Sequence, residues 1–256
     1  MNPFMPLKGK VIEDKTINDK KFLRIEKNFS FIPGQFVEIS IAGVGEFPIS
    51  ICSPPYEKDF FEVCIRKVGR ATSFLYNSEK IDYILYRGPF GNGFPMEKLE
   101  GKDIVLIIGG LGILPLRSFI KEAIHSKIYN KMKILYGARS RQDLLFAEEI
   151  EEWKNYAEVY EIFEKEGVKR GFVTELIDEI VFDGKEYILI CGPPAMFKPV
   201  IEKALEMGAD EEKIYVSVER RMKCGIGKCG HCIIGSYYSC IDGPVFEYAK
   251  YKHAIL

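Results

Sequence analysis

The chain has no excess of either charge and no long apolar run. Its 256 residues include 36 Lys and Arg against 37 Asp and Glu, which gives a formal net charge of −1. This balance indicates neither nucleic-acid binding nor attraction to an anionic membrane surface. Even the apolar run at 104–108 is far shorter than the roughly 20 residues that a membrane-spanning helix needs. We therefore expect no nucleic-acid partner and no membrane span.

The chain also lacks the sequence features of secretion and of repeats. Residues 1–6 have neither the basic nor the apolar part of a signal peptide, and no repeat or low-complexity tract follows. The seven cysteines are odd in number, which argues against a complete disulfide framework. We expect a cytoplasmic protein with reduced thiols. Its length is enough for two ordinary domains.

Four of the cysteines lie close together near the end of the chain with the spacing C-x4-C-x2-C-x7-C. This is the plant-type spacing of [2Fe–2S] ligands, with three close together and a fourth further on. Interspersed glycines allow tight turns that direct backbone N–H groups at sulfur. Because such a cluster carries one electron at a time, the pattern indicates electron transfer. The predicted metal ligands are Cys224, Cys229, Cys232 and Cys240.

Two other uses of these cysteines stay open at this point. A structural zinc site usually has two separated Cys pairs, whereas three of these cysteines lie within nine residues. Disulfides are disfavoured because Cys52, Cys64 and Cys191 are scattered. His231 lies between two of the predicted ligands. We place it outside the ligand set, because four cysteines suffice and Rieske centres use histidines in pairs.

Residues 1–97 read as short strands separated by turns, without a convincing helical period. Six segments are rich in β-branched and aromatic residues and predict a small antiparallel β-barrel. These segments are residues 11–14, 21–26, 35–41, 48–52, 60–66 and 83–87.

Residues 98–218 alternate apolar strands with amphipathic helices. This alternation predicts a doubly wound α/β domain with a parallel sheet. The remaining residues, 219–256, form a small lobe that we expect the cluster to organise. The expected strands are 104–108, 132–136, 158–163, 187–191 and 213–218, and the expected helices are 115–126, 143–153, 173–180 and 195–207.

Two loops predict a dinucleotide site in this domain. Each follows a predicted parallel strand and opens a helix, where glycine backbone can approach a diphosphate and the helix offers free N–H groups. Ordinary tight turns are the alternative. Cys191 has no base partner in the sequence, so we expect its thiol to touch the nicotinamide or flavin and not to act as a nucleophile. The predicted loop residues are Gly109, Gly110, Gly112, Gly192 and Pro193.

A third loop, residues 136–141, bears on the choice of nucleotide. An NAD site usually places an acidic residue here for the ribose hydroxyls, but this loop carries Arg139, Ser140 and Arg141. Two arginines and a serine suit a 2′-phosphate. The loop favours NADP(H), while NAD(H) or a solvated basic turn stays open.

Over its whole length the chain resembles the ferredoxin–NADP reductase-like electron-transfer subunits. The order of barrel, nucleotide sheet and C-x4-C-x2-C-x7-C lobe carries this resemblance. Residues 219–232, ERRMKCGIGKCGHC, look most like the gamma subunits of sulfhydrogenases and the corresponding flavin and iron–sulfur component of anaerobic sulfite reductase. The electron-transfer subunit of dihydroorotate dehydrogenase is similar as well.

The resemblance implies FAD in the barrel. The family motif R-x-Y-S corresponds to residues 47–50, where Phe47 replaces the arginine that clamps the diphosphate. The resemblance places Pro48 and Ile49 along the flavin ring and Ser50 at its reactive edge. The replacement leaves the choice between FAD and FMN open.

A second flavin motif corresponds to residues 66–73, and residues 87–94 match the loop that closes the barrel. Without the resemblance, residues 66–73 would read as a strand end and a helix cap. In the motif, Gly69 permits close backbone approach and Thr72 and Ser73 bind phosphate oxygens. Arg66 or Arg70 supplies the charge that Phe47 lacks.

Together these motifs predict an electron-transfer flavoprotein subunit. A hydride passes between the nicotinamide and FAD, and single electrons pass through the [2Fe–2S] cluster to or from a redox partner subunit. Ser50 and Cys191 are the only side chains that we place at the reacting atoms. A stand-alone NAD(P)H reductase for ferredoxin and a zinc-stapled binding module are the alternatives. Four cations flank the cluster, either to raise its potential or to form a docking face: Arg220, Arg221, Lys223 and Lys228.

Overall fold

The structure is a computed structural model that describes residues 3–167 and 169–255. The chain divides into two compact units, each containing more than one segment. The first comprises residues 1–93, 117–122 and 219–244. The second comprises residues 94–116, 123–218 and 245–256.

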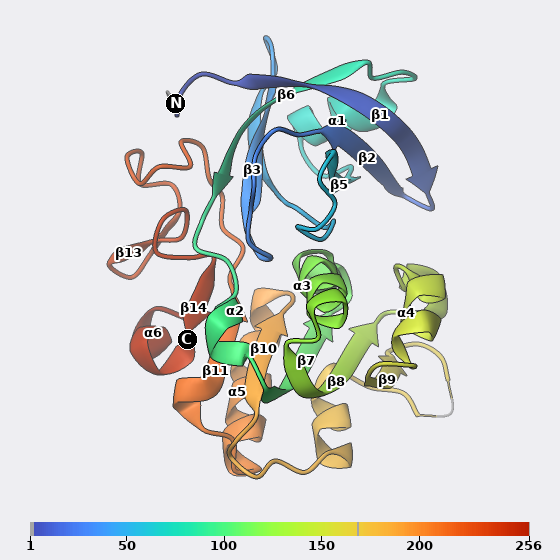
Figure 1. The fold of residues 1–256 in the computed structure, drawn as a ribbon, viewed down its shortest axis with the longest axis vertical. Coiled ribbons are helices and arrows are strands. Elements are labelled where there is room, and N and C mark those ends of the chain that lie inside the picture. The colour runs from blue at the N-terminus through green and yellow to red at the C-terminus, as the bar shows by residue number, and fades with distance from the viewer. Residues whose placement is uncertain (1–2, 168, 256) are drawn as a thin grey trace. The chain divides into compact units, whose positions relative to one another are not determined.

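The first unit is built on a six-stranded antiparallel sheet (Figure 1) in the order β4-β3-β6-β1-β2-β5. The sheet is barrel-like but open, because no hydrogen-bonded ladder joins β4 to β5 among the described residues. The predicted antiparallel barrel fold is confirmed in this open form. The strands are β1 (Leu7–Ile17), β2 (Lys20–Glu26), β3 (Phe36–Ile41), β4 (Gly45–Ser50), β5 (Phe60–Arg66) and β6 (Tyr83–Phe90).

The expectation of strands without helices in this region was wrong, because it contains helix α1 (Arg70–Asn77) and the single turn α2 (Met96–Leu99). The alternative interpretation of residues 66–73 as a strand end and a helix cap agrees with the end of β5 and the start of α1. Only Leu75 of α1 is buried, so the short helix leaves almost no apolar period in the sequence. Hydrogen bonds to the Thr72 side chain fix its start. Thr72 Oγ1 accepts from the backbone N–H of Gly69 at 2.9 Å.

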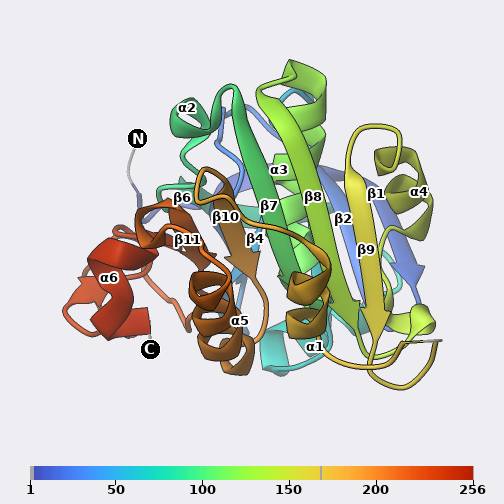
Figure 2. The same cartoon turned by 90° about the horizontal axis from the view of Figure 1, so that it is seen from below.

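The second unit contains a parallel sheet in the order β14-β11-β10-β7-β8-β9, with β14 antiparallel at one edge. The helix α3 (Ile113–Ser126) and the helix α5 (Pro194–Glu206) lie on opposite faces of this sheet (Figures 1 and 2), which confirms the doubly wound fold. The strands are β7 (Lys102–Gly109), β8 (Tyr129–Ala138), β9 (Glu158–Phe163), β10 (Tyr187–Cys191), β11 (Ile214–Ser217) and β14 (Val245–Glu247).

Two helical segments of this unit differ from the sequence prediction. The segment η3 (Val173–Glu179) is a 3-10 helix and not an α-helix. The helix α4 (Ala147–Trp153) is shorter than expected, because the short 3-10 turn η2 (Arg141–Asp143) and an extended stretch precede it. No helix among the described residues is long and apolar enough to cross a membrane.

The cysteine-bearing segment packs against strands of the barrel. Buried Met222, Cys232 and Cys240 form a small apolar cluster with Phe36, and Phe90 packs against it. A short hairpin lies beside the cysteines, formed by β12 (Ile233–Ile234) and β13 (Tyr237–Tyr238). The chain then returns to the second unit through β14 and the helix α6 (Tyr248–Ile255).

The barrel sheet also buries a carboxyl group. Glu38 on β3 has no exposed surface, and neither of its carboxylate oxygens has a hydrogen-bond partner among the described residues. Burial raises the pKa of Glu38 to about 8, against the opposing charge of Arg87, while Glu46 and Cys224 add to the rise. A buried carboxyl group thus avoids the cost of an uncompensated charge by keeping its proton.

This group predicts a pH-dependent stability. Below pH 4.5 both the folded and unfolded chains protonate Glu38, and between 4.5 and about 8 only the unfolded chain releases the proton. The free energy of unfolding should therefore fall as pH rises through this window, by at most about 1.4 kcal/mol per pH unit. In Glu38→Gln, denaturant unfolding at pH 5.5, 6.5 and 7.5 should show a shallower dependence on pH. Glu26→Gln, at an exposed position in the same sheet, should keep the wild-type slope, and an equal slope in both variants would contradict the assignment.

Candidate functional site

The sulfur atoms of the four predicted ligands approach one another in pairs. Cys232 and Cys240 place their Sγ atoms 3.3 Å apart, and the Cys224 thiol is in hydrogen-bond contact with Cys229. No three His, Cys, Asp or Glu side chains among the described residues converge closely enough to bind one metal ion. Two pairs of thiols fit a two-iron cluster, whose four cysteine ligands are shared between two irons.

Backbone N–H groups of the loop point at these sulfurs. Gly227 donates to Cys240 Sγ at 3.1 Å, and Lys228 donates to Cys224 Sγ at 3.3 Å. The loop makes these bonds possible by turning at glycines with positive φ, of which Gly225 has +72° and Gly227 +69°. Such N–H···S bonds stabilise bound thiolates and the charge of a reduced cluster.

The four thiols differ in their surroundings. A hydrogen bond from the backbone N–H of His231, with others from the same loop, lowers the pKa of exposed Cys229. Burial and the neighbouring Cys232 thiol raise the pKa of Cys240 to about 12. The site therefore has a buried side toward the barrel and an exposed side at Cys229.

The predicted flavin-edge residues lie on β4. In the ladder with β3, Ser50 pairs with Phe36 and Pro48 pairs with Glu38. Phe36 also contacts the cluster of buried cysteines. Phe47 is half-buried and packs on the barrel core, so it fills apolar space where the family motif has an arginine.

The second predicted flavin motif forms the end of β5 and the start of α1. Here the Thr72 hydroxyl is already used, because it accepts from Val68 and Gly69 N–H groups and donates to the Gly69 carbonyl. Arg66 and Arg70 are exposed, and neither lies within ion-pair distance of a carboxylate among the described residues. At longer range, the charge of Arg66 helps to lower the pKa of Asp19 and opposes the rise of the Glu219 pKa that burial causes. Ser73 is half-buried with a hydroxyl that makes no hydrogen bond within the same set. The charges at this helix start are therefore available for a phosphate, while Thr72 acts through the backbone turn.

The two glycine loops of the second unit meet, as the sequence predicted. Their strands β7 and β10 are neighbours, with Ile108 paired to Cys191. A Cβ atom on Gly112 would lie 2.1 Å from the Cys191 carbonyl oxygen, so only glycine fits this contact. Gly192 faces the Met196 side chain in the same place. Cys191 itself is buried, with 1% of its surface exposed, although we expected its thiol to touch the nicotinamide or flavin.

The arginine loop follows β8. Arg139 is exposed and has no ion-pair partner in the part of the chain that the structure describes. The Arg141 guanidinium lies 5.1 Å from the centroid of the Phe163 ring, and its backbone N–H donates to the Glu166 carboxylate. Ser140 donates to Asp143 at 2.7 Å. Of the two arginines, Arg139 therefore has the side chain that is more available to a ligand.

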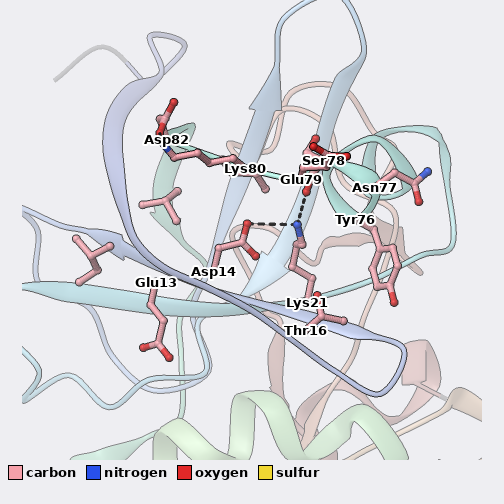
Figure 3. Close-up of a pocket in the computed structure, with 13 residues that line it drawn as sticks. Glu13, Asp14, Thr16, Lys21, Tyr76, Asn77, Ser78, Glu79, Lys80 and Asp82 are labelled. Atoms are coloured by element: carbon pink, nitrogen blue, oxygen red, sulfur yellow. Dashed lines mark hydrogen bonds and ion pairs between the residues drawn. The ribbon is translucent and has the colours of Figure 1, made fainter.

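A separate surface pocket of about 570 Å³ lies on the barrel between β1, β2 and the segment after α1 (Figure 3). Two of its lysines, Lys21 and Lys80, pair with the lining carboxylates of Asp14 and Asp82. Lys21 Nζ donates to the Ser78 carbonyl at 2.7 Å and to Asp14 at 3.3 Å. None of the predicted site residues lines it.

Sequence comparisons agree with this architecture. The chain is 44% identical to the gamma subunit of sulfhydrogenase 2 from Pyrococcus furiosus, over 97% of this chain and 96% of that protein. It is 34% identical to a probable dihydroorotate dehydrogenase B (NAD(+)) electron transfer subunit of the same organism, over 91% and 89% of the two chains. The chain belongs to this family of electron-transfer subunits.

Family models and solved structures cover the same parts. Residues 106–202 match the oxidoreductase NAD-binding domain, and residues 219–251 match the iron–sulfur cluster binding domain of dihydroorotate dehydrogenase B. An NADH-dependent reduced ferredoxin-NADP oxidoreductase aligns with a TM-score of 0.78 and 25% identity, over 96% of this chain and 92% of that one. A ferredoxin NADP+ reductase from Neisseria gonorrhoeae, 18% identical, shares the fold with a TM-score of 0.70 over 83% and 98% of the chains.

These findings confirm several predictions made from the sequence. The family and the function class are those expected: an electron-transfer subunit of an NAD(P)H-dependent oxidoreductase. The predicted cofactors, FAD, a [2Fe–2S] cluster and NAD(P)H, agree with the family and its fold. The relatives are named as subunits of larger enzymes, in agreement with the predicted partner subunit.

The contact at Gly112 generates a stability prediction. Gly112→Ala should lower the free energy of unfolding by about 1–3 kcal/mol, because the new methyl group meets the Cys191 backbone. The matched control is Gly192→Ala, whose methyl group would lie 2.7 Å from the flexible end of Met196 and 3.1 Å from the nearest backbone atom, Gly109 N, against 2.1 Å for Gly112→Ala. Denaturant unfolding without added nucleotide should show the larger loss in Gly112→Ala. Equal losses in the two variants would show that the backbone contact is not decisive.

Proposed function

We propose that this chain transfers electrons between NAD(P)H and a partner catalytic subunit, with named residues at each cofactor. When bound, FAD supplies the chemistry that links a two-electron hydride donor to a one-electron cluster. Residues 1–97 would hold the flavin, 98–218 the nucleotide and 219–256 the cluster. The observation that carries this proposal is the position of Phe36. Its backbone pairs with Ser50, and its side chain packs with the cysteine cluster.

Cys224, Cys229, Cys232 and Cys240 are the proposed ligands of the [2Fe–2S] cluster. Their two pairs of thiols and the N–H groups that point at them support this assignment. The exposed side at Cys229 suits electron exchange with another protein. Zinc is less suited, because a zinc site brings four thiolates around one ion.

The flavin is proposed to bind along β4 and the start of α1. Pro48 and Ile49 would contact the ring, and Ser50 would orient its reactive edge by hydrogen bonding. The diphosphate would lie against the backbone at Gly69, where the helix start and Arg66 or Arg70 provide positive charge. Two available arginines and the unengaged Ser73 hydroxyl support this placement despite Phe47.

The nucleotide is proposed to bind across Gly109, Gly110 and Gly112 on one loop and Gly192 and Pro193 on the other. We favour NADP(H), with Arg139 and Arg141 at the 2′-phosphate. Cys191 would contribute at the nicotinamide through its backbone, because its thiol is buried.

The partner is proposed to be the catalytic subunit of a hydrogenase-, sulfur-reductase- or dihydroorotate dehydrogenase-type enzyme, so the native state is a hetero-oligomer. We further propose a cytoplasmic location. The relatives' subunit names and the cysteines without disulfide bonds support these two statements.

The cluster assignment predicts the outcome of cysteine substitutions. Anaerobically purified protein should contain about two irons per chain and give the electron paramagnetic resonance signal of a reduced [2Fe–2S] cluster. Changing any one of the four proposed ligands to Ser should remove most of the iron. Cys52→Ser, at a buried thiol of the barrel, is the control and should retain it. Colourless wild-type protein with one zinc per chain would refute the assignment.

The nucleotide assignment predicts a specific loss in Arg139→Ala. Removing one charge-assisted hydrogen bond, worth about 1.5–3 kcal/mol, should raise the KM for NADPH roughly tenfold or more. The KM for NADH should stay near its wild-type value. Lys131→Ala, at the other end of β8, should change neither constant. An unchanged KM for NADPH in Arg139→Ala would place the 2′-phosphate elsewhere.

A further inference from the structure

The buried side chain of Arg87 on β6 lies where the barrel meets the cysteine loop. The side chain is only 4% exposed, and each of its five N–H donors has a partner. Nε and Nη2 donate to the Glu46 carboxylate at 3.1 and 2.8 Å. Nη1 donates to the carbonyls of Pro3 and Cys224 at 3.0 and 2.8 Å, and Nη2 donates to the Lys223 carbonyl at 2.9 Å.

This set of bonds is specific to arginine. A buried charge is tolerated only when it is paired and hydrogen-bonded, and here one carboxylate and three backbone carbonyls provide the partners. Lysine has three donors on a single nitrogen, so it cannot bind the Glu46 carboxylate bidentately and also reach carbonyls on two segments. Two of those carbonyls belong to Lys223 and Cys224, at the start of the cluster loop.

The same guanidinium is tied to the strand that carries the flavin-edge residues. Glu46 lies on β4, four residues before Ser50. On the other side, the Phe90 ring lies beneath Arg87 and would meet a Cβ atom on Gly225 at 2.6 Å. The loop that begins at Cys224 is therefore held against the barrel by hydrogen bonds and by close packing.

We propose that Arg87 is a positioning residue for the iron–sulfur cluster. It fixes the backbone of Cys224 relative to β4, and its positive charge beside the loop favours the reduced, more negative form of the cluster. This inference rests on the proposed function, because it needs a cluster at the four cysteines.

The surroundings of Arg87 screen its positive charge less on the side of the cysteine loop than the ion pair with Glu46 alone would suggest. The Glu46 side chain is about a third exposed (35%), whereas the Arg87 guanidinium is buried. Solvent therefore screens the negative charge of Glu46 more strongly than it screens the positive charge of Arg87. Although burial alone would raise it, the hydrogen bonds from Arg87 and Ser40 lower the pKa of Glu46. The cations at Lys223 and Lys228 are exposed, so water and salt weaken their effect on the cluster.

The test uses Arg87→Gln and Arg87→Lys in the full-length protein loaded with iron and FAD. The readouts are the iron content, the g-values of the reduced cluster and its midpoint potential in a redox titration. Arg87→Gln should shift the ratio of reduced to oxidised cluster about tenfold toward the oxidised form, which is about 59 mV for one electron. Arg87→Lys keeps the positive charge, so the midpoint potential of its cluster should lie closer to the wild-type value than that of Arg87→Gln. Its g-values should still differ from those of the wild type.

Lys223→Gln is the matched control, since it removes an exposed cation from the same loop. Its shift in the ratio should be less than about threefold, because its charge is screened. Wild-type g-values and potential in both Arg87 variants would overturn the inference. If neither Arg87 variant retains iron, the test is made with Glu46→Gln, which removes the charge of the Arg87 partner and leaves Arg87 in place. Changed g-values in Glu46→Gln support the inference, and wild-type g-values overturn it. A wild-type protein without a [2Fe–2S] signal would instead refute the proposed function.

Discussion

The five hydrogen bonds of one buried guanidinium bring together three parts of the chain that are distant in sequence. Arg87 on β6 binds Glu46 on β4, the start of the chain at Pro3, and the loop at Cys224. The barrel has apolar residues in its interior and would pack without this group. The cysteine loop is different, because it has little core of its own and depends on the barrel for its place.

The nucleotide half depends on a different kind of contact. Its two glycine loops meet backbone to backbone, with Gly112 against the Cys191 carbonyl. A contact of this kind follows from the parallel pairing of β7 with β10, which brings both strand ends to one edge of the sheet. The side chains that we propose for the 2′-phosphate, Arg139 and Arg141, lie apart from this contact, on the loop after β8. The place of the cysteine loop thus depends on a buried ionic network, whereas the contact of the two glycine loops depends on the absence of a side chain at Gly112.

Much of this architecture could be predicted from the sequence, because its strongest signals are local. Apolar strands such as 158–163 and 187–191 were placed at their observed bounds, and the cysteine spacing favoured a [2Fe–2S] cluster while zinc and disulfides stayed open. The helix α1 left little apolar pattern in the sequence, since it buries one residue, and only its start was marked, by the alternative interpretation of residues 66–73 as a strand end and a helix cap. The 3-10 geometry of η3 also leaves no distinct pattern in the sequence.

Long-range pairings were the other part that sequence reasoning missed. Arg87 was noted only as the first residue of a loop motif, because its partners lie up to 137 positions away. Glu38 was not singled out within the predicted strand at 35–41, yet it is fully buried. A charged residue inside a strand of apolar and aromatic neighbours is the signal that could have marked both positions. The role of such a residue depends on its neighbours in the folded chain, and the sequence does not show which residues these are.

The edge strand β14 has a consequence for how the cysteine segment could be exchanged. β14 pairs with β11, and Ser217 lies opposite Val245, so the chain leaves the sheet and returns to it at adjacent positions. Paired residues on neighbouring antiparallel strands have Cα atoms only about 5 Å apart. Residues 219–244 are therefore an insertion whose two ends are already joined by a ladder. A segment of different length, carrying another redox centre or none, could replace it without moving the strands at either end.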